Sequence, residues 1–216
     1  MSDRRRNGLL VTFEGPEGSG KSTLVGGLAE LLSARCGAPL LLREPGGTPV
    51  GERIREILLD PALRELRPET ELLLMVASRA QLVCEAILPA LSSGRIVLCD
   101  RYADASVAYQ GAGRGLGEDR VGVLNDFAVG ETVPDLTLLC LLPPEAGRSR
   151  TAGRALDRLE REDAAFHDRV YASYRAMVDA GDPRFQAVDA TRSPEEMMEQ
   201  AVSILRSLEH DLLKDL

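Results

Sequence analysis

A glycine-rich loop between an apolar run and a helical pattern constrains this chain more than any other feature. Residues 15–22 (GPEGSGKS) fit G-x-x-x-x-G-K-S/T, a loop whose backbone N–H groups and lysine surround phosphate groups. The apolar run at 9–14 predicts a buried strand before the loop, and leucines at 24, 28, 31 and 32 predict a helix over 21–35. A strand, a glycine loop and a helix in this order are what such an anion-binding loop requires.

The lysine at position 21 adds weight to this interpretation. The chain contains only two lysines, Lys21 and Lys214, against 24 arginines. A compact ammonium reaches between two phosphates, where a planar guanidinium fits poorly. We therefore predict a site for a nucleoside triphosphate, with Mg²⁺ bound by the hydroxyl of Ser22. The predicted contacts are Gly15, Pro16, Glu17, Gly18, Ser19, Gly20, Lys21, Ser22 and Thr23.

Composition narrows the class of protein. A length of 216 residues with 44% hydrophobic residues suits one domain with a substantial core, in which we expect residues 1–7 to be disordered. The net charge of −8 argues against a nucleic-acid groove, which needs a basic face. Four dispersed cysteines indicate a reducing compartment, and neither a signal peptide nor a membrane span is expected. These features predict a cytoplasmic protein.

The hydrophobic pattern alternates between short apolar runs and helical segments. Strands are expected at 9–14, 40–42, 95–99, 136–142 and 185–188. Helices are expected at about 50–59, 68–92, 104–110, 118–129, from 144, at 162–180 and at 194–213. This alternation predicts an α/β fold with a parallel sheet, helices on both faces and ligands at the carboxyl ends of the strands.

Charged residues follow the strands that are expected beside the loop. Asp100 ends one apolar strand and is placed to hold Mg²⁺, while Arg101 and Arg43 could each grip a phosphate. The competing interpretation is a strand-end turn with a surface ion pair or an exposed arginine. Arg79 lies in a mostly apolar helix, where it either forms an ion pair in the core or donates to a ligand.

The segment 148–161 resembles a mobile lid more than a second domain. It contains arginines at positions 148, 150, 154, 158 and 161 and glycine at 153. Each arginine could belong to a solvated helical face. One that reached the transferring phosphate would supply a charge that the loop at 15–22, which has no arginine, lacks. Arg150 and Arg154 are our candidates for this role.

Several segments together resemble those of thymidylate kinases. In the family's order, over about 9–210, they are Glu17 in the loop, REPGGT at 43–48, SRAQ at 78–81, DRY at 100–102, AYQGAGRG at 108–115, LDRLE at 156–160 and DAT at 189–191. The resemblance implies a five-stranded parallel sheet of the P-loop nucleoside monophosphate kinase type and a homodimer to which 68–92 contributes. It implies the reaction ATP + dTMP → ADP + dTDP with Mg²⁺, a step of dTTP synthesis for DNA replication.

The resemblance also implies roles for individual residues. Arg43 and Arg101 would hold the dTMP phosphate, Arg79 would donate to a thymine carbonyl, and Gln110 would face the base edge. Tyr109 would line the sugar, Glu17 would contact its 3′-hydroxyl region, and the adenine would lie near the turn at 190–191. Predicted catalytic residues are Glu17, Lys21, Asp100, Arg101, Arg150 and Arg154. Predicted acceptor contacts are Glu17, Arg43, Pro45, Met75, Arg79, Arg101, Ala105, Ser106, Tyr109 and Gln110; Thr191 would contact ATP, and Ser22 and Asp100 the metal.

Two positions depart from the family's pattern. Met75 stands where a phenylalanine usually stacks on thymine, and Ala105 stands where serine is common. A methionine can cover a ring, but a planar stack of about 0.5–1.5 kcal/mol is lost. A kinase of another nucleoside monophosphate is therefore the nearest rival, and a nucleotide-binding regulatory protein without turnover is another. A switch GTPase is excluded because lysine occurs only at 21 and 214, so no guanine-reading N-K-x-D segment exists.

Overall fold

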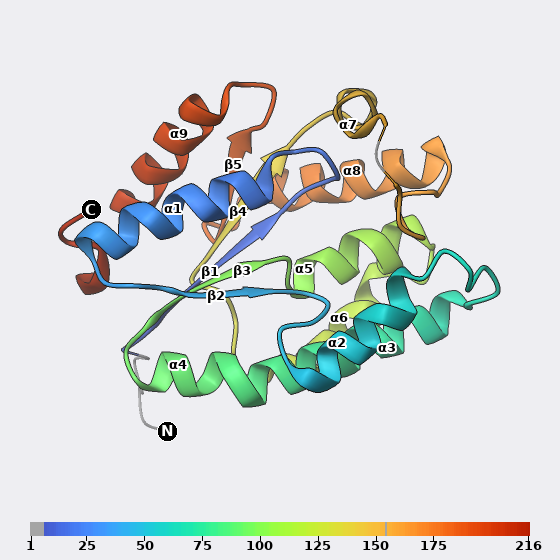
Figure 1. Cartoon of the computed structure of the whole chain (residues 1–216), viewed down its shortest axis with the longest axis horizontal. Helices are drawn as coiled ribbons and strands as arrows, with labels where there is room; N and C mark the ends of the chain where they lie inside the picture. The colour runs from blue at the N-terminus through green and yellow to red at the C-terminus, as the bar shows by residue number, and fades with distance from the viewer. Residues whose placement is uncertain (1–6, 154) are drawn as a thin grey trace.

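A five-stranded parallel sheet forms the centre of the part of the chain that the structure describes. The computed structural model describes residues 7–153 and 155–216. The expectation for residues 1–7 therefore lies outside the described residues except at Asn7, and that for Arg154 lies outside them entirely. The strands are β1 (Leu9–Glu14), β2 (Leu40–Arg43), β3 (Ile96–Asp100), β4 (Leu136–Leu141) and β5 (Phe185–Asp189), in the order β2-β3-β1-β4-β5 (Figure 1). The predicted α/β fold is confirmed.

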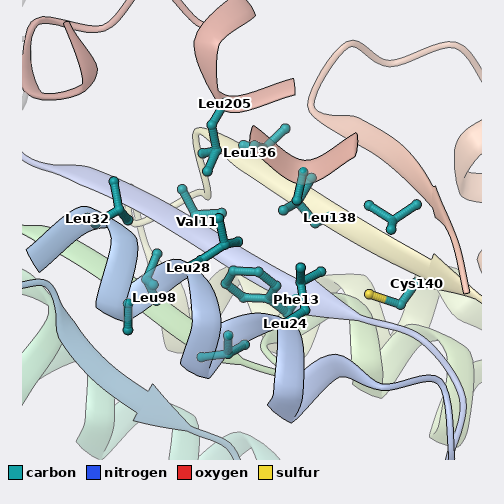
Figure 2. Close-up of a cluster of buried hydrophobic side chains, with 14 of the residues drawn as sticks. Val11, Phe13, Leu24, Leu28, Leu32, Leu98, Leu136, Leu138, Cys140 and Leu205 are labelled. Atoms are coloured by element: carbon teal, nitrogen blue, oxygen red, sulfur yellow. The ribbon is translucent and has the colours of Figure 1, made fainter. Parts of the chain in front are cut away.

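Helices cover both faces of the sheet (Figure 1). On one face, α1 (Lys21–Arg35) and α9 (Pro194–Ser207) pack over Leu9, Val11 and Phe13, and Figure 2 shows this cluster. Leu10 points to the opposite face, where it meets residues such as Leu82. Successive strand residues point to opposite faces, so a strand buried on both faces reads as the continuous apolar run at 9–14.

The remaining helices lie between the strands in the chain, except for the last one, which follows α9. They are α2 (Pro49–Leu59), α3 (Pro68–Leu82), the π-helical turn η1 (Val83–Ile87), α4 (Leu88–Ser92), α5 (Ala103–Ser106), the π-helical segment η2 (Val107–Gly113), α6 (Glu118–Val129), α7 (Pro144–Thr151), α8 (Ala164–Asp179) and the 3₁₀ turn η3 (Asp211–Leu213).

The closing helix α9, expected to reach 213, ends at Ser207 instead, and Glu209 follows with a left-handed φ of 49°. A capping box of Ser193 and Glu196 begins it.

The long apolar helix expected over 68–92 is continuous but contains the π-helical turn η1. Pro89 lacks the N–H that an α-helix would donate to residue 85, and its ring crowds that carbonyl, which accounts for a widened turn just before it. By length and composition Pro68–Ser92 could cross a membrane. Its Glu71 and Arg79, however, are fully buried and form ion pairs with other parts of the chain, which identifies it as a core helix.

The sheet order brings the predicted site together. Strands β1 and β3 are neighbours, with Phe13 opposite Asp100, so the glycine loop after β1 lies beside Asp100 and Arg101. The carboxyl ends of both strands open on the same edge, which is where parallel α/β sheets bind ligands.

Candidate active site

The loop after β1 presents its backbone to a ligand. A Cβ atom at Gly15 would collide with the carbonyl oxygen of Cys140 on β4, so the loop can lie this close to the sheet only with glycine there. Gly20 caps α1 in a left-handed conformation, with φ 81°, and no side chain caps the helix. The first N–H groups of α1 therefore have no capping side chain, which is the arrangement that an anion site at a helix N-terminus requires.

Lys21 is held over this loop. Its Nζ donates to the carbonyl oxygens of Gly15 and Pro16 at 2.8 and 2.9 Å and to Ser19 Oγ at 3.3 Å. Burial, and then the nearby charge of Arg101, lowers the pKa of Lys21 to about 8, although Glu17 acts in the opposite direction. A polyphosphate bound in the loop would favour the charged form of this ammonium.

Arg101 stands at the centre of a cluster at the end of β3. Its guanidinium donates to Glu17 Oε1 at 2.8 Å and to the hydroxyls of Tyr109 and Tyr174 at 3.0 and 3.3 Å. Its backbone adopts φ 70°, which is uncommon outside glycine, and its N–H donates to Phe13 O. Burial opposes the charge of Glu17, but Arg101 and Lys21 outweigh it and lower the pKa of this carboxyl.

Glu14, a residue that sequence reasoning missed, supports this cluster from below. Its carboxyl is fully buried and accepts the N–H groups of Tyr102 and Ala105, and the hydroxyl of Tyr174 at 2.9 Å. Burial, and then the charge of Asp104, raises the pKa of Glu14 to about 8. An acidic residue ending an apolar strand beside the phosphate loop was the available signal.

Arg79 forms an ion pair in the core, which was one of its two expected roles. Its guanidinium contacts Glu44 Oε2 at 2.6 Å and also donates to Asn125 Oδ1 and the carbonyl oxygen of Tyr102. Only 1% of the residue is exposed. It still lines the cleft, so a bond from Arg79 to a base stays a prediction that requires one of these contacts to be exchanged.

A cleft of about 300 Å³ collects most of the predicted acceptor residues. Met75, Tyr109 and Gln110 lie in it together with Lys21 and Arg101. Of the predicted residues, it is lined by Glu17, Gly18, Lys21, Ser22, Pro45, Met75, Arg79, Asp100, Arg101, Ala105, Ser106, Tyr109 and Gln110. The other lining residues were not predicted as contacts, although four of them lie in segments that the sequence singled out; they are Glu44, Arg55, Leu59, Asp157, Leu159 and Glu160.

Arg43, predicted to hold a phosphate, does not line this cleft. It pairs with Glu52 at 2.8 Å and its side chain is 54% exposed. Arg55, three residues beyond Glu52 on α2, lines the cleft instead, and its Nη1 donates to Pro45 O at 2.9 Å. Arg43 ends the edge strand β2, where the following helix offers its guanidinium a carboxylate. The interpretation of Arg43 as an exposed arginine of a turn fits this geometry better.

A second cavity of about 700 Å³ lies on the other side of the loop. It is lined by Gly18, Gly20, Thr23, Leu24, Gly27, Arg150, Arg192, Pro194, Glu195, Met197 and Met198. Arg150 reaches over it and donates to Gly18 O at 3.3 Å and Ala190 O at 2.9 Å. The predicted contact Thr191 is not among its lining residues; its hydroxyl donates to Asp189 at 2.6 Å. Pro16 borders a third cavity beside α7.

Ser22 and Asp100, the predicted metal ligands, lie together at the mouth of the cleft. Ser22 Oγ donates to Asp100 Oδ2 at 2.9 Å, so a hydroxyl oxygen and a carboxylate oxygen lie next to each other. Among the described residues, no group of three His, Cys, Asp or Glu side chains could hold a metal ion by itself. These hard oxygen ligands suit Mg²⁺, which commonly uses one or two protein ligands with waters and phosphate oxygens.

Comparisons with known proteins agree with this geometry. A family profile described as thymidylate kinase matches residues 13–201. The chain is 52% identical to a thymidylate kinase of Pseudomonas savastanoi pv. phaseolicola, over 86% of this chain and 89% of that one. It is 43% identical to one of Lactobacillus delbrueckii subsp. bulgaricus, over 93% and 96%. A crystal structure of thymidylate kinase from Ehrlichia chaffeensis matches with a TM-score of 0.76 at 29% identity, over 92% of this chain and 98% of that one. The chain belongs to the thymidylate kinase family, whose members phosphorylate dTMP to dTDP.

Proposed function

We propose that dTMP binds in the 300 Å³ cleft and ATP in the 700 Å³ cavity, with phosphoryl transfer across the glycine loop between them. The main support for this arrangement is that Gly18 lines both cavities. A triphosphate wrapped by the loop would then have its adenosine on the side of Arg150 and its terminal phosphate on the side of Arg101. Two nucleotides bound in this way would meet at their phosphates.

The acceptor phosphate would be held by Arg101 and Arg55, with Arg55 taking the role that the sequence assigned to Arg43. Both guanidinium groups line the cleft, whereas that of Arg43 does not. A phosphate oxygen is already anionic at neutral pH, so the acceptor needs no general base. Catalysis would then rest on positioning and on neutralising charge, with Lys21 beside the transferring group.

Mg²⁺ would be bound through Ser22 and Asp100, where it would neutralise charge on the phosphates of ATP. The hydrogen bond between Ser22 Oγ and Asp100 Oδ2, which places both oxygens side by side, supports this assignment. On the ATP side, Arg150 would add a further positive charge near the phosphates, since its guanidinium already contacts the loop at Gly18. We propose that the segment 148–161 acts as a lid that brings such a charge to the phosphates and excludes water.

An assay of the purified protein with ATP, Mg²⁺ and a panel of nucleoside monophosphates tests the proposed function. We expect phosphorylation of dTMP and much slower phosphorylation of dCMP, dAMP and dGMP. Preference for a purine monophosphate would support the rival kinase. ATP binding without transfer to any acceptor would support the regulatory protein.

We further propose a homodimer formed through α3 and α6, in the cytoplasm. Three large apolar side chains are exposed on these helices: Leu73, Val123 and Phe127, the last 86% exposed. The four cysteines, all within the described residues, are free thiols, which suits a reducing compartment. Sedimentation of the wild type should give a dimer, and Phe127→Glu should give a monomer. An unchanged mass for the variant would place the interface elsewhere.

A further inference from the structure

A fully buried carboxylate lies behind the cleft without lining it. Glu71, on α3, accepts from Gln110 Nε2 at 2.9 Å. It also pairs with the guanidinium groups of Arg114, at 2.9 Å, and Arg158, at 2.6 Å. Glu162 contacts Arg114 from the far side, at 2.7 Å. The cluster therefore balances two carboxylates against two arginines, and one of the two carboxylates also holds a residue of the cleft wall.

The bond between Glu71 and Gln110 fixes the direction of an amide. A carboxylate between two guanidinium groups offers only lone pairs, so Gln110 must turn its NH₂ group toward it and its oxygen away. That oxygen, Gln110 Oε1, is buried and has no hydrogen-bond partner among the described residues. Gln110 is 1% exposed and lines the cleft beside Tyr109 and Ser106. An acceptor without a partner is costly in such a place unless a ligand supplies a donor.

We propose that Glu71 is a positioning residue for base selection, which holds the Gln110 amide so that its oxygen faces the base. This inference rests on the proposed function. Thymine and uracil carry an N–H at position 3, which this oxygen can accept. Cytosine carries a lone pair at that position, so two acceptors would face each other. Glu71 thus selects against cytosine nucleotides without touching the substrate, and it leaves the choice between thymine and uracil to other residues.

The test compares Glu71→Gln with a matched control, Glu162→Gln. With glutamine at 71, either amide can donate, so the orientation of Gln110 is no longer dictated. We expect KM for dTMP to rise about tenfold, the scale of one hydrogen bond, and the preference for dTMP over dCMP in kcat/KM to fall at least as much. The kcat for dTMP and KM for ATP should change less than about threefold, since neither depends on the base edge. Glu162→Gln removes a carboxylate of the same cluster that does not contact Gln110, so it should leave the preference unchanged.

A purely structural role for Glu71 predicts a different result. Loss of the ion pairs alone would lower the melting temperature of both variants and leave the base preference the same in both. That outcome would overturn the inference. The exchange variant Glu71→Gln/Gln110→Glu provides a rescue, because glutamine at 71 can donate to glutamate at 110, whose other oxygen faces the base. It should recover the preference for dTMP.

A measurement on the unaltered protein covers the case in which the variants do not fold. In ¹⁵N-edited NMR spectra, the side-chain NH₂ of Gln110 should exchange slowly with solvent both before and after dTMP is added, because Glu71 holds it throughout. Rapid exchange in the free protein, or a change of partner on binding, would refute the positioning role. If the wild type does not phosphorylate dTMP at all, the proposed function fails instead, whatever this amide does.

Discussion

Replacing Arg101 by alanine removes a guanidinium group to which three side chains of the site are hydrogen-bonded. The wild-type guanidinium joins Glu17 to the hydroxyls of Tyr109 and Tyr174, and it lines the cleft where we place the acceptor phosphate. Loss of one aligned electrostatic donor lowers kcat by about 100- to 1,000-fold in other enzymes. We expect a loss of at least about a hundredfold in turnover of dTMP for Arg101→Ala, on that scale.

The same change should cost stability, by an amount that can be estimated separately. Glu17 would lose a charged hydrogen bond of 2.8 Å in a site where both side chains are only 19% exposed, which amounts to about 1.5–3 kcal/mol. The energetic cost of the left-handed φ of 70° at this position should be the same in the variant, because this region is as unfavourable for alanine as for arginine. Thermal unfolding and steady-state kinetics on the same preparation separate the two effects.

Arg101→Lys serves as the control for geometry. It keeps the charge but loses the planar fork that reaches three partners, so its turnover should lie between those of the wild type and Arg101→Ala. Turnover of Arg101→Ala within about threefold of wild type, in a folded protein, would refute the role we give this residue.

Three further predictions concern the cleft and the buried Glu14 beside it. Arg55→Ala should raise KM for dTMP at least about tenfold through loss of a charged contact, whereas Arg43→Ala should change it less than about twofold, because exposed pairs contribute little; equal effects would contradict our assignment. Met75→Phe should lower KM for dTMP by restoring a ring against the base, and an unchanged or raised KM would show that the base lies elsewhere. Because the folded-state pKa of Glu14 is raised to about 8 from 4.5, its protonation stabilises the fold below pH 4.5, and this contribution is lost as pH rises to 8. Melting temperatures between pH 5 and 8 should therefore fall more steeply for wild type than for Glu14→Gln, and parallel curves would argue against the raised pKa.

The fold could be predicted from sequence because its signals are local. The run at 9–14, the glycine loop and the leucines of α1 each indicate an element within a few residues, and the alternation along the chain indicates a parallel sheet. The predicted end of the last helix was wrong, because the left-handed turn at Glu209 has no strong sequence signal. The π-helical turns were missed because their residues look like those of any apolar helix.

The site was predictable where motifs mark it and less so where side chains compete for partners. Lys21, Asp100 and Arg101 follow adjacent strands, so topology alone brings them together. The sequence favoured Arg43, which ends a strand, over Arg55 in the following helix. Only the structure shows that Arg43 pairs with Glu52, while Arg55 lines the cleft. The roles of Glu14 and Glu71 depend on burial and on partners far along the chain, which a single sequence does not reveal.

A crystal structure with dTMP and a non-hydrolysable ATP analogue tests the placement of the two nucleotides most directly. We expect the dTMP phosphate to contact Arg101 and Arg55, the base to contact Gln110, and the triphosphate to lie in the loop at 15–22. The adenosine should lie in the cavity of Arg150 and Arg192. Adenosine in the 300 Å³ cleft, or dTMP bound away from Arg101, would refute this placement of the two nucleotides.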